Sequence, residues 1–259
     1  MIRTPIEIDF DAYPLWTREF FEGAKAFDSS CSREARVIFI DKGEGYYLKR
    51  AERGTLEAEK AMTEYFHKKK MATEVLGYES TEYDWLLTKR VKGEDCTHKK
   101  YLDDPKRLCD TIAILLRELH EMDFADCSVD RVKSYLDTVE KSYHSGHFDN
   151  DLTDETRKID REEAYRIASE GKHLLKKEVL LHGDYCLPNI MLDNWAFSGF
   201  IDLGNGGVGD RHIDLFWGAW TLKFNLGTDK YYDRFFDVYG RDRVDFDALR
   251  VIAAMECFG

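Results

Sequence analysis

The N-terminal third of the chain contains short runs of β-branched and aromatic residues interrupted by turn-forming ones. The runs ARVIFID (35–41) and GYYLKR (45–50) are separated by KGE, and this pattern predicts a β-hairpin. The stretch TLEAEKAMTEYFHKKK (55–70) has helical periodicity instead, with Thr55 as the expected N-cap and lysines in the last turn. DWLLTKRV (84–91) predicts a further strand, and Gly93 marks a break after it.

The rest of the chain has mainly helical periodicity. In PKRLCDTIAILLRELHEMD (105–123), large apolar residues recur at helical spacing. Strand-like runs return at 179–181, 189–193 and 197–202, and DNWAFSG is expected to form a loop between the last two. The pattern therefore predicts an α+β protein with a β-rich lobe over residues 1–92 and a larger, mainly helical lobe over residues 93–259.

Composition and charge restrict the class of protein. The chain has 259 residues, of which 43% are hydrophobic, as in a globular protein. No apolar run approaches the roughly 20 residues that span a bilayer, and the start lacks the apolar core of a signal peptide, so a cytoplasmic protein is expected. The six cysteines form no C-x-x-C pair, which favours reduced thiols. A net charge of −12 argues against binding to nucleic acid; it suits a cationic ligand, or serves solubility alone.

Lys49 and Glu59 are the first residues with chemical potential. Lys49 lies near the end of an apolar strand, and Glu59 lies within the apolar helical face that Met62 and Phe66 define. A buried carboxylate without a partner is costly, and Lys49 is the nearest sensible partner. The alternative interpretation is that Lys49 extends into water and Glu59 sits at the edge of the apolar face.

A second group of polar residues follows the short apolar runs near residue 180. Asp184 and Asn189 have the spacing D-x-x-x-x-N, and Asp202 ends the run SGFID. Carboxylate and amide oxygens suit magnesium, and protein kinases divide catalysis and metal binding among residues with this spacing. Asx turns between strands are the alternative, but they do not explain the whole ordered set with Lys49 and Glu59.

These motifs together resemble the aminoglycoside phosphotransferase family, antibiotic kinases with a protein-kinase-like fold. The resemblance is carried by HGDYCLPNIM (182–191) and SGFIDLGNGGVGDRHIDL (198–215), with support from YYLK, LEAEK, LLRELHEMD and the end MECFG. It extends in order over nearly the whole chain and is strongest to the 3′-phosphotransferase branch. It implies a two-lobed fold with an antiparallel β N-lobe and a mainly helical C-lobe.

The resemblance assigns roles to the ordered polar residues. Asp184 corresponds to the catalytic Asp that faces the acceptor hydroxyl. Asn189 and Asp202 correspond to the ligands of Mg²⁺. Lys49 would hold the phosphates of the nucleotide, and Glu59 would fix Lys49 by an ion pair.

Further positions would contact the phosphoryl donor, which is ATP or GTP. Ser32 lies in SSCS (29–32), which aligns with the flexible loop over the phosphates. Lys89 and Val91 belong to the hinge whose backbone would read the purine edge. The nucleotide and magnesium are expected in a cleft between the two lobes.

The chain departs from the family pattern where the acceptor is expected. Asn205 follows IDLG, where the family often has Arg, and the helix after Asp214 reads WGAWTLKFNLG where acids are usual. At the C-terminus, Glu256 keeps one acid of the usual pair. Asp154 and Glu155, in the segment FDNDLTDETRKIDREE, are acids that would meet a cationic acceptor, unless this is only a solvated acidic loop.

The sequence thus predicts a kinase that transfers the γ-phosphoryl group to a hydroxyl of an aminoglycoside, most simply its 3′-hydroxyl, and so confers antibiotic resistance. Three alternatives stay open. One is a kinase for another small alcohol, such as an amino alcohol or sugar; another is a nucleotide-binding protein without turnover; the third is a purely structural or interaction role. The chain is expected to be a monomer or a homodimer.

Overall fold

The chain divides into two compact units. The computed structural model describes residues 3–32, 34–150 and 158–259. One unit, here called the sheet unit, comprises Met1–Asp95 and Asn189–Gly204; the other, the helical unit, comprises Cys96–Pro188 and Asn205–Gly259.

The elements of the sheet unit include most of the strands. In chain order they are β1 (Thr4–Ile6), α1 (Arg18–Phe21), β2 (Lys25–Asp28), β3 (Ala35–Asp41), β4 (Tyr46–Glu52), α2 (Glu57–Lys68), β5 (Val75–Ser80), β6 (Tyr83–Lys89), β7 (Glu94–Asp95), β9 (Ile190–Asp193) and β10 (Ala196–Phe200).

The helical unit carries the remaining elements. They are α3 (Lys99–Leu102), α4 (Pro105–His120), α5 (Arg131–Ser145), α6 (Arg161–Gly171), β8 (Val179–Leu181), β11 (Gly207–Gly209), α7 (Arg211–Leu226), α8 (Tyr232–Tyr239) and α9 (Phe246–Glu256).

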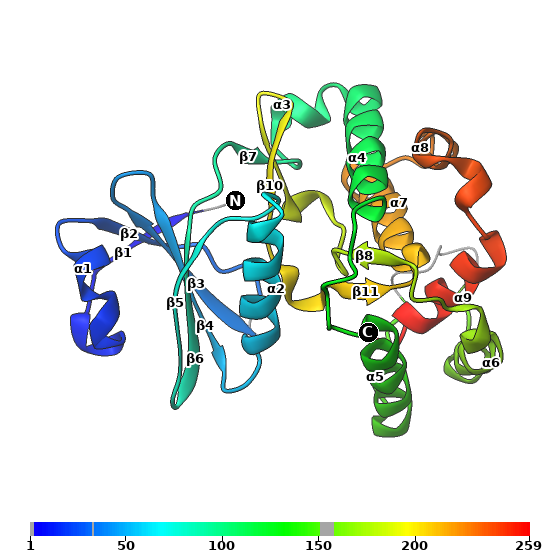
Figure 1. Cartoon of the computed structure of the whole chain (residues 1–259), viewed down its shortest axis with the longest axis horizontal. Helices are drawn as coiled ribbons and strands as arrows, with labels where there is room; N and C mark the ends of the chain where they lie inside the picture. The colour runs from blue at the N-terminus through cyan, green and yellow to red at the C-terminus, as the bar shows by residue number, and fades with distance from the viewer. Residues whose placement is uncertain (1–2, 33, 151–157) are drawn as a thin grey trace. The chain divides into compact units, whose positions relative to one another are not determined.

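An antiparallel sheet dominates the sheet unit. Within the described residues it has six strands in the order β1-β2-β3-β4-β6-β5, and the predicted hairpin is confirmed as β3 and β4. Side chains alternate between the two faces of β4. Leu48 joins the cluster that the segment around α1 covers, whereas Ala51 joins the cluster against Leu56 at the start of α2 (Figure 1). Lys49 is two residues from Ala51 and therefore points to the same face of the sheet, which is the face that α2 covers.

The start of α2 differs from the prediction. Thr55 is not the N-cap, because its hydroxyl donates to the Glu52 carbonyl at 2.7 Å and Leu56 occupies the cap position without a side-chain cap bond. The buried Asp84 of β6 supplies a side-chain hydrogen bond at the start of α2 instead, because its Oδ2 accepts from the Leu56 N–H at 2.9 Å. A long-range contact between strand and helix thus fixes the origin of α2, which sequence spacing does not reveal.

A second, smaller sheet in the same unit joins β7, β9 and β10. The strands β9 and β10 are antiparallel neighbours, with Phe200 opposite Ile190. The predicted loop DNWAFSG is wrong in extent, because only Asn194 and Trp195 lie between the strands. Their φ angles of 50° and 72° match the two-residue turns whose twist suits a hairpin. The hairpin brings the residues that precede β9 close to those that follow β10.

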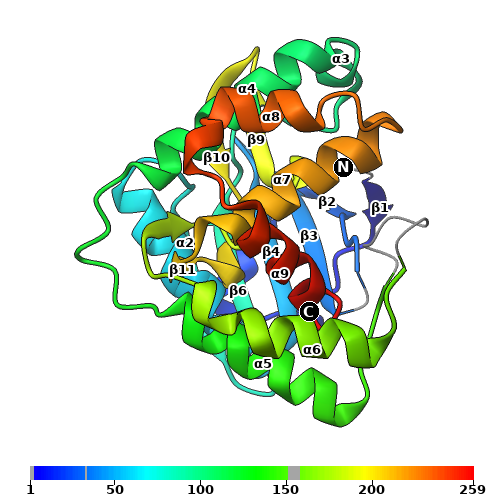
Figure 2. The ribbon, with the colours of Figure 1, turned by 90° about the vertical axis from the view of Figure 1, so that its right-hand side faces the viewer.

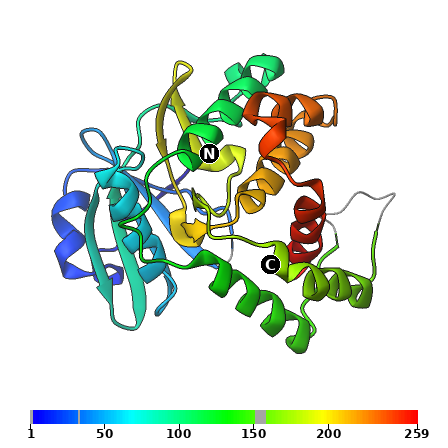
Figure 3. The same ribbon diagram turned by 45° about the vertical axis from the view of Figure 1, so that its right-hand side comes forward.

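In the helical unit, α7 packs against α4, α8, α9 and β8 (Figure 2). A core that includes Ile213 of α7 and Ile252 of α9 joins α5, α6, α7 and α9. The helices α6 and α9 lie side by side near the C-terminus (Figure 3). The short strands β8 and β11 pair next to this core and position the loop that follows Leu181.

Neither a membrane-spanning helix nor a disulfide bond is found in the described residues. Among the described residues, no helix combines the length and apolar character that crossing a bilayer requires. The same residues contain no disulfide bond.

Candidate active site

The sheet unit brings together three of the predicted residues. Lys49 Nζ lies 2.7 Å from Glu59 Oε2 and 2.8 Å from Asp202 Oδ1. Each member comes from a different element: Lys49 from β4, Glu59 from α2, and Asp202 from the residues after β10. Lys49 therefore does not extend into water, and the alternative interpretation of this pair is wrong.

The charges of this cluster depend on one another. Burial lowers the pKa of Lys49, but the Asp202 and Glu59 carboxylates outweigh that effect, so the pKa is raised and the ammonium stays charged. Burial raises the pKa of Glu59, Lys49 opposes this, and Asp202 adds to it. Removing Lys49 would leave two carboxylates facing each other in a partly buried site, which is unfavourable.

Asn189 and Asp202 form a set of oxygen donors at the base of the β9–β10 hairpin. The Asn189 carbonyl accepts a hydrogen bond from the N–H of Ile201 at 3.1 Å, which places the two segments side by side. Asn189 is buried, whereas the Asp202 side chain is 50% exposed. Asp202 also has a left-handed backbone, with φ 57°. One carboxylate and one carboxamide fit Mg²⁺, which usually takes few ligands from protein and the others from phosphates and water.

The predicted hinge residues Lys89 and Val91 differ in whether their backbone N–H and carbonyl groups are already hydrogen-bonded. The Lys89 N–H donates to the Glu74 carbonyl at 3.0 Å, and its carbonyl accepts from the Thr73 hydroxyl at 2.8 Å. Its side chain pairs with Glu74 at 2.6 Å. Val91 is buried, and within the described residues neither its N–H nor its carbonyl makes a hydrogen bond. Val91, rather than Lys89, therefore has backbone groups available for a purine edge.

Ser32 lies in the connection between β2 and β3. It is exposed, as expected for a residue of a loop over phosphates. The connection is anchored at its base, because the Ser30 Oγ accepts from the Val37 N–H at 2.9 Å and the Ser29 N–H donates to the Val37 carbonyl at 2.8 Å.

The loop that carries Asp184 belongs to the helical unit and follows β8. The buried carboxylate of Asp214, on α7, accepts from the backbone N–H groups of His182 and Gly183, each at 2.8 Å. His182 Nδ1 in turn accepts from the Asp184 N–H at 3.3 Å. His120 braces Asp214, with Nε2 3.2 Å from Asp214 Oδ2 and Nδ1 2.8 Å from the Tyr239 hydroxyl. Because these groups are buried, the network fixes the backbone that presents Asp184.

Gly183 is required at its position. Its φ is 86°, and a Cβ there would lie 1.8 Å from the carbonyl oxygen of Asn205. Asn205, the departure from the family pattern, thus lies against the Asp184 loop.

On its other side, the Asp184 loop is held by α7. The Thr221 hydroxyl accepts from the Leu187 N–H at 3.1 Å. Burial, followed by the Asp184 carboxylate, raises the pKa of the Cys186 thiol in this loop.

The predicted acceptor-binding acids have different outcomes. Asp154 and Glu155 lie outside the described residues. Glu256 is 5% exposed, and its Oε1 accepts from the Tyr135 hydroxyl at 2.7 Å and from Trp217 Nε1 at 3.2 Å. Burial raises the pKa of Glu256 to about 7, with a smaller contribution from Asp184 in the same direction. Tyr135 and Trp217 were not expected here, because partners so distant along the chain leave no local signal.

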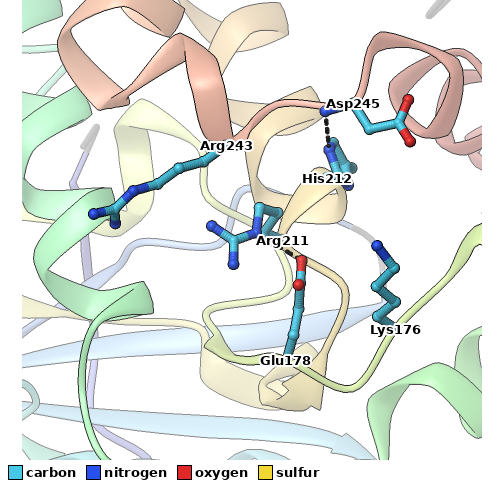
Figure 4. Close-up of a pocket in the computed structure, with 6 residues that line it drawn as sticks. All are labelled: Lys176, Glu178, Arg211, His212, Arg243 and Asp245. Atoms are coloured by element: carbon cyan, nitrogen blue, oxygen red, sulfur yellow. Dashed lines mark hydrogen bonds and ion pairs between the residues drawn. The ribbon is translucent and has the colours of Figure 1, made fainter.

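A separate pocket of about 340 Å³ lies at the start of α7 (Figure 4). None of its lining residues belongs to the Asp184 loop. Arg211 pairs with Glu178 at 2.6 Å, and Arg243 pairs with Glu121 at 2.5 Å. His212 donates from Nδ1 to Asp210 at 2.7 Å and accepts from the Asp245 N–H at 2.9 Å. Both ring nitrogens are therefore engaged, and His212 is not available to a metal.

The fold and the two groups of residues together define a phosphotransferase with a protein-kinase-like fold. Solved structures share the architecture. An aminoglycoside-3′-phosphotransferase of type VIII superposes with a TM-score of 0.75 at 23% identity, over 96% of each chain. An aminoglycoside phosphotransferase from Streptomyces rimosus, in complex with ADP and streptomycin, has a TM-score of 0.76 at 22% identity, over 97% of this chain and 99% of that one. The predicted α+β, kinase-like fold is confirmed.

Sequence similarity is more specific than the fold. The model of the phosphotransferase enzyme family matches residues 26–252, and the chain belongs to this family. A probable aminoglycoside 3′-phosphotransferase of Lactococcus lactis subsp. lactis (strain IL1403) is 51% identical over 256 residues, which cover 98% of each chain. An aminoglycoside 3′-phosphotransferase of Niallia circulans is 31% identical over 68% of this chain and 67% of its own length. The resemblance inferred from the motifs is confirmed.

Proposed function

We propose that the protein is an aminoglycoside kinase that transfers the γ-phosphoryl group of ATP to the 3′-hydroxyl of its acceptor and thereby confers resistance. The observation that carries this function is the Lys49–Glu59–Asp202 cluster, with contacts of 2.7 and 2.8 Å, in a chain that also holds Asp184 on a braced loop. The relatives named 3′-phosphotransferases support the choice of acceptor and hydroxyl.

Each residue has a distinct part in the proposed reaction. Lys49 offsets the charge of the nucleotide phosphates, and Glu59 keeps its ammonium in place. Asp202 and Asn189 hold Mg²⁺, which when bound neutralises charge on the phosphates. Asp184 accepts the hydrogen bond of the attacking hydroxyl and aligns its oxygen, so that transfer depends mainly on positioning.

The donor and acceptor are proposed to bind through different groups. The backbone of Val91 reads the purine edge, and Ser32 contributes to the loop over the phosphates. ATP is the proposed donor, with GTP as the alternative. Asp154, Glu155 and Glu256 are proposed to meet the ammonium groups of the acceptor.

The same activity implies where the protein works and how the chain is organised. A nucleotide donor supports a cytoplasmic location for the enzyme. Residues 1–92 form the nucleotide-binding lobe in this proposal, and residues 93–259 form the lobe for catalysis and acceptor binding. A monomer or a homodimer is compatible with this function.

A second acceptor class is favoured by one observation. The helix α7 presents Trp220 and Phe224 beside the residues that hold the Asp184 loop, and aromatic rings pack on the apolar face of a sugar or amino alcohol whether or not it carries several charges. A kinase for another small alcohol, such as an amino alcohol or sugar, is therefore the alternative function.

The direct test is mass-spectrometric detection of phosphorylated product. The purified protein is incubated with Mg-ATP or Mg-GTP and a panel of kanamycin-type and other aminoglycosides, amino alcohols and sugars. Phosphorylated kanamycin is expected. If only another small alcohol is modified, the alternative function replaces the first; if nothing is modified although Mg-nucleotide binds, the proposal of a kinase fails.

The role of Asp184 is tested by Asp184→Asn. Transfer should fall about 10²–10⁴-fold, because a neutral carboxamide holds and aligns the attacking hydroxyl more weakly than the carboxylate and cannot take its proton, while the affinity for Mg-ATP stays within about twofold. The matched control is Asp229→Asn, a change of an exposed acid in the same unit, which should leave turnover unchanged. Wild-type turnover by Asp184→Asn would refute the assignment.

A further inference from the structure

Three aromatic side chains follow one another in contact along α7, here called the aromatic column: Trp217, which is partly buried against the core of the helical unit, the half-buried Trp220 and the exposed Phe224. The rings of Trp220 and Phe224 are stacked, with centroids 4.9 Å apart and an interplanar angle of 13°. Trp217 meets Trp220 edge to face at 5.5 Å. Positions three and four apart share one side of a helix, so the column forms one continuous surface.

The aromatic column lies beside the catalytic loop. Thr221, which shares its side of α7, accepts from the Leu187 N–H at 3.1 Å, and in the same loop the Cys186 N–H donates to the Asp184 carbonyl at 2.8 Å. At the other end of the column, Trp217 donates to the Glu256 carboxylate at 3.2 Å. All these residues belong to the helical unit, so their arrangement does not depend on the sheet unit.

The exposure of Phe224, at the end of the column, is difficult to explain by folding alone. Phe224 is 69% exposed, although burying a phenyl ring would stabilise the fold. A single exposed apolar residue needs no explanation, but Phe224 stacks on the half-buried Trp220, and the two rings together form a flat apolar surface of the kind that often marks a binding site. The flat stack of Trp220 and Phe224 is also held in place by α7, the helix that fixes the Asp184 loop, so its distance from the reacting hydroxyl is set by a rigid element.

We propose that the aromatic column is the platform on which the acceptor ring lies while its hydroxyl faces Asp184. The acceptor class is a polycationic amino sugar. Its apolar ring face packs on the aromatic rings of Trp220 and Phe224, and an ammonium group lies over their π faces. This use of aromatic rings replaces part of the binding that carboxylates would provide on α7. The inference rests on the proposed function.

Substitutions at Phe224 and Trp220 separate a π platform from plain hydrophobic surface. Phe224→Ala removes the ring, Phe224→Leu keeps an apolar side chain without a π face, and Phe224→Tyr restores the ring. For both Ala and Leu, the KM for kanamycin and the dissociation constant measured by calorimetry should rise about 5- to 10-fold, whereas Tyr should restore wild-type values. The KM for ATP and the melting temperature should not change.

Trp220 offers a spectroscopic readout that does not depend on turnover. Kanamycin binding should change the tryptophan fluorescence of the wild-type protein, and Trp220→Phe should lose most of that change while keeping affinity within about twofold. Phe246→Ala serves as the control, because Phe246 is an exposed aromatic in the same unit, 43% exposed, outside the column. It should alter none of these values.

The outcomes distinguish this inference from the proposed function. If the wild-type protein phosphorylates kanamycin and Phe224→Ala and Phe224→Leu bind it with wild-type affinity, the platform is refuted and the proposed function stands. If Phe224→Leu behaves as wild type while Phe224→Ala does not, the surface acts by area alone and the π platform is refuted. If the wild-type protein neither binds nor phosphorylates any amino sugar, both fail.

Discussion

Two carboxylates with proposed roles have contrasting environments within their own units. Glu59 is partly buried next to an ammonium, so its charge has a partner at 2.7 Å. Glu256 is buried next to a hydroxyl and an indole N–H, and these neutral donors together with the charge of Arg131 do not offset the loss of solvation. Glu256 therefore carries a free-energy cost when charged.

Because the charged form of Glu256 is costly in the folded protein, the free energy of unfolding should depend on pH. The pKa is about 7 in the folded protein against an ordinary value of 4.5, so the folded state holds the proton more tightly than the unfolded one. Stability from this group is present below pH 4.5 and is lost as pH rises through about 7. Glu256→Gln, which stays neutral, should be more stable than wild type by about 3 kcal/mol at pH 8.

Urea denaturation at pH 5 and pH 8 measures this difference. At pH 5 most of the advantage of Glu256→Gln should be gone, because wild-type Glu256 is then protonated in the folded state. Glu82→Gln, a change at an exposed position, should show no pH-dependent difference from wild type. Equal stability of Glu256→Gln and wild type at pH 8 would contradict the assignment.

At the scale of elements, α7 connects much of the proposed site. One of its faces enters the core through Ile213, while Asp214 and Thr221 hold the Asp184 loop from two sides. The aromatic column runs along α7 from the partly buried Trp217 to the exposed Phe224. A single helix thus fixes the catalytic loop and presents the proposed acceptor platform.

Asp214→Asn tests the dependence of the loop on α7. Both carboxylate oxygens accept backbone N–H groups, so an amide must point its NH₂ at one of them whichever way it turns. The free energy of unfolding should fall by about 2–4 kcal/mol, and turnover should fall while ATP affinity stays near wild type. Urea denaturation and steady-state kinetics measure both effects.

The control for Asp214→Asn is Asp137→Asn. Asp137 is 63% exposed on α5 and, among the residues that the structure describes, pairs only with Lys133, so its loss should cost under about 0.5 kcal/mol. Wild-type stability of Asp214→Asn would show that the buried network does not hold the loop.

The sequence predicts elements well where the pattern is local. β3 is found over Ala35–Asp41 and β8 over Val179–Leu181, as predicted. The cap of α2 and the extent of the β9–β10 turn were predicted wrongly. In α2 a residue 28 positions away replaces the local cap. In the hairpin, Asn194 and Trp195 adopt positive φ angles that only the pairing of β9 with β10 imposes.

The candidate site shows the same limit. The ordered set of Lys49, Glu59 and Asp202 was accessible from spacing and motif, and the structure joins its side chains by ion pairs. The hydrogen-bond partners of Glu256 cannot be predicted from the sequence. Tyr135 is 121 positions away, and only the tertiary fold brings it to Glu256. Motifs reveal the residues whose chemistry a family shares. They do not reveal the tertiary contacts that set the environment of each residue in one particular protein.

For the whole molecule, charge has opposite consequences for the two proposed substrates. The net charge of −12 attracts a polycationic acceptor and repels an anionic nucleotide. Raising KCl from about 50 to 300 mM shortens the range of both effects. The KM for kanamycin should therefore rise on the order of 3- to 10-fold, while the KM for Mg-ATP should not rise.

Steady-state kinetics at matched osmolality, with sucrose in place of salt, separate charge screening from other effects of the solute. A kanamycin KM that does not respond to KCl would show that binding rests on uncharged contacts alone.

The contact between Gly183 and Asn205 limits how the gene can diverge. The atom that excludes a Cβ at position 183 is a backbone carbonyl oxygen, and every amino acid at position 205 has one. A missense change at codon 183 therefore cannot be suppressed by changing the side chain at 205. Lineages that lose Gly183 should regain function by true reversion, and recombination between diverged copies can exchange the residue at 205 freely while leaving this glycine in place.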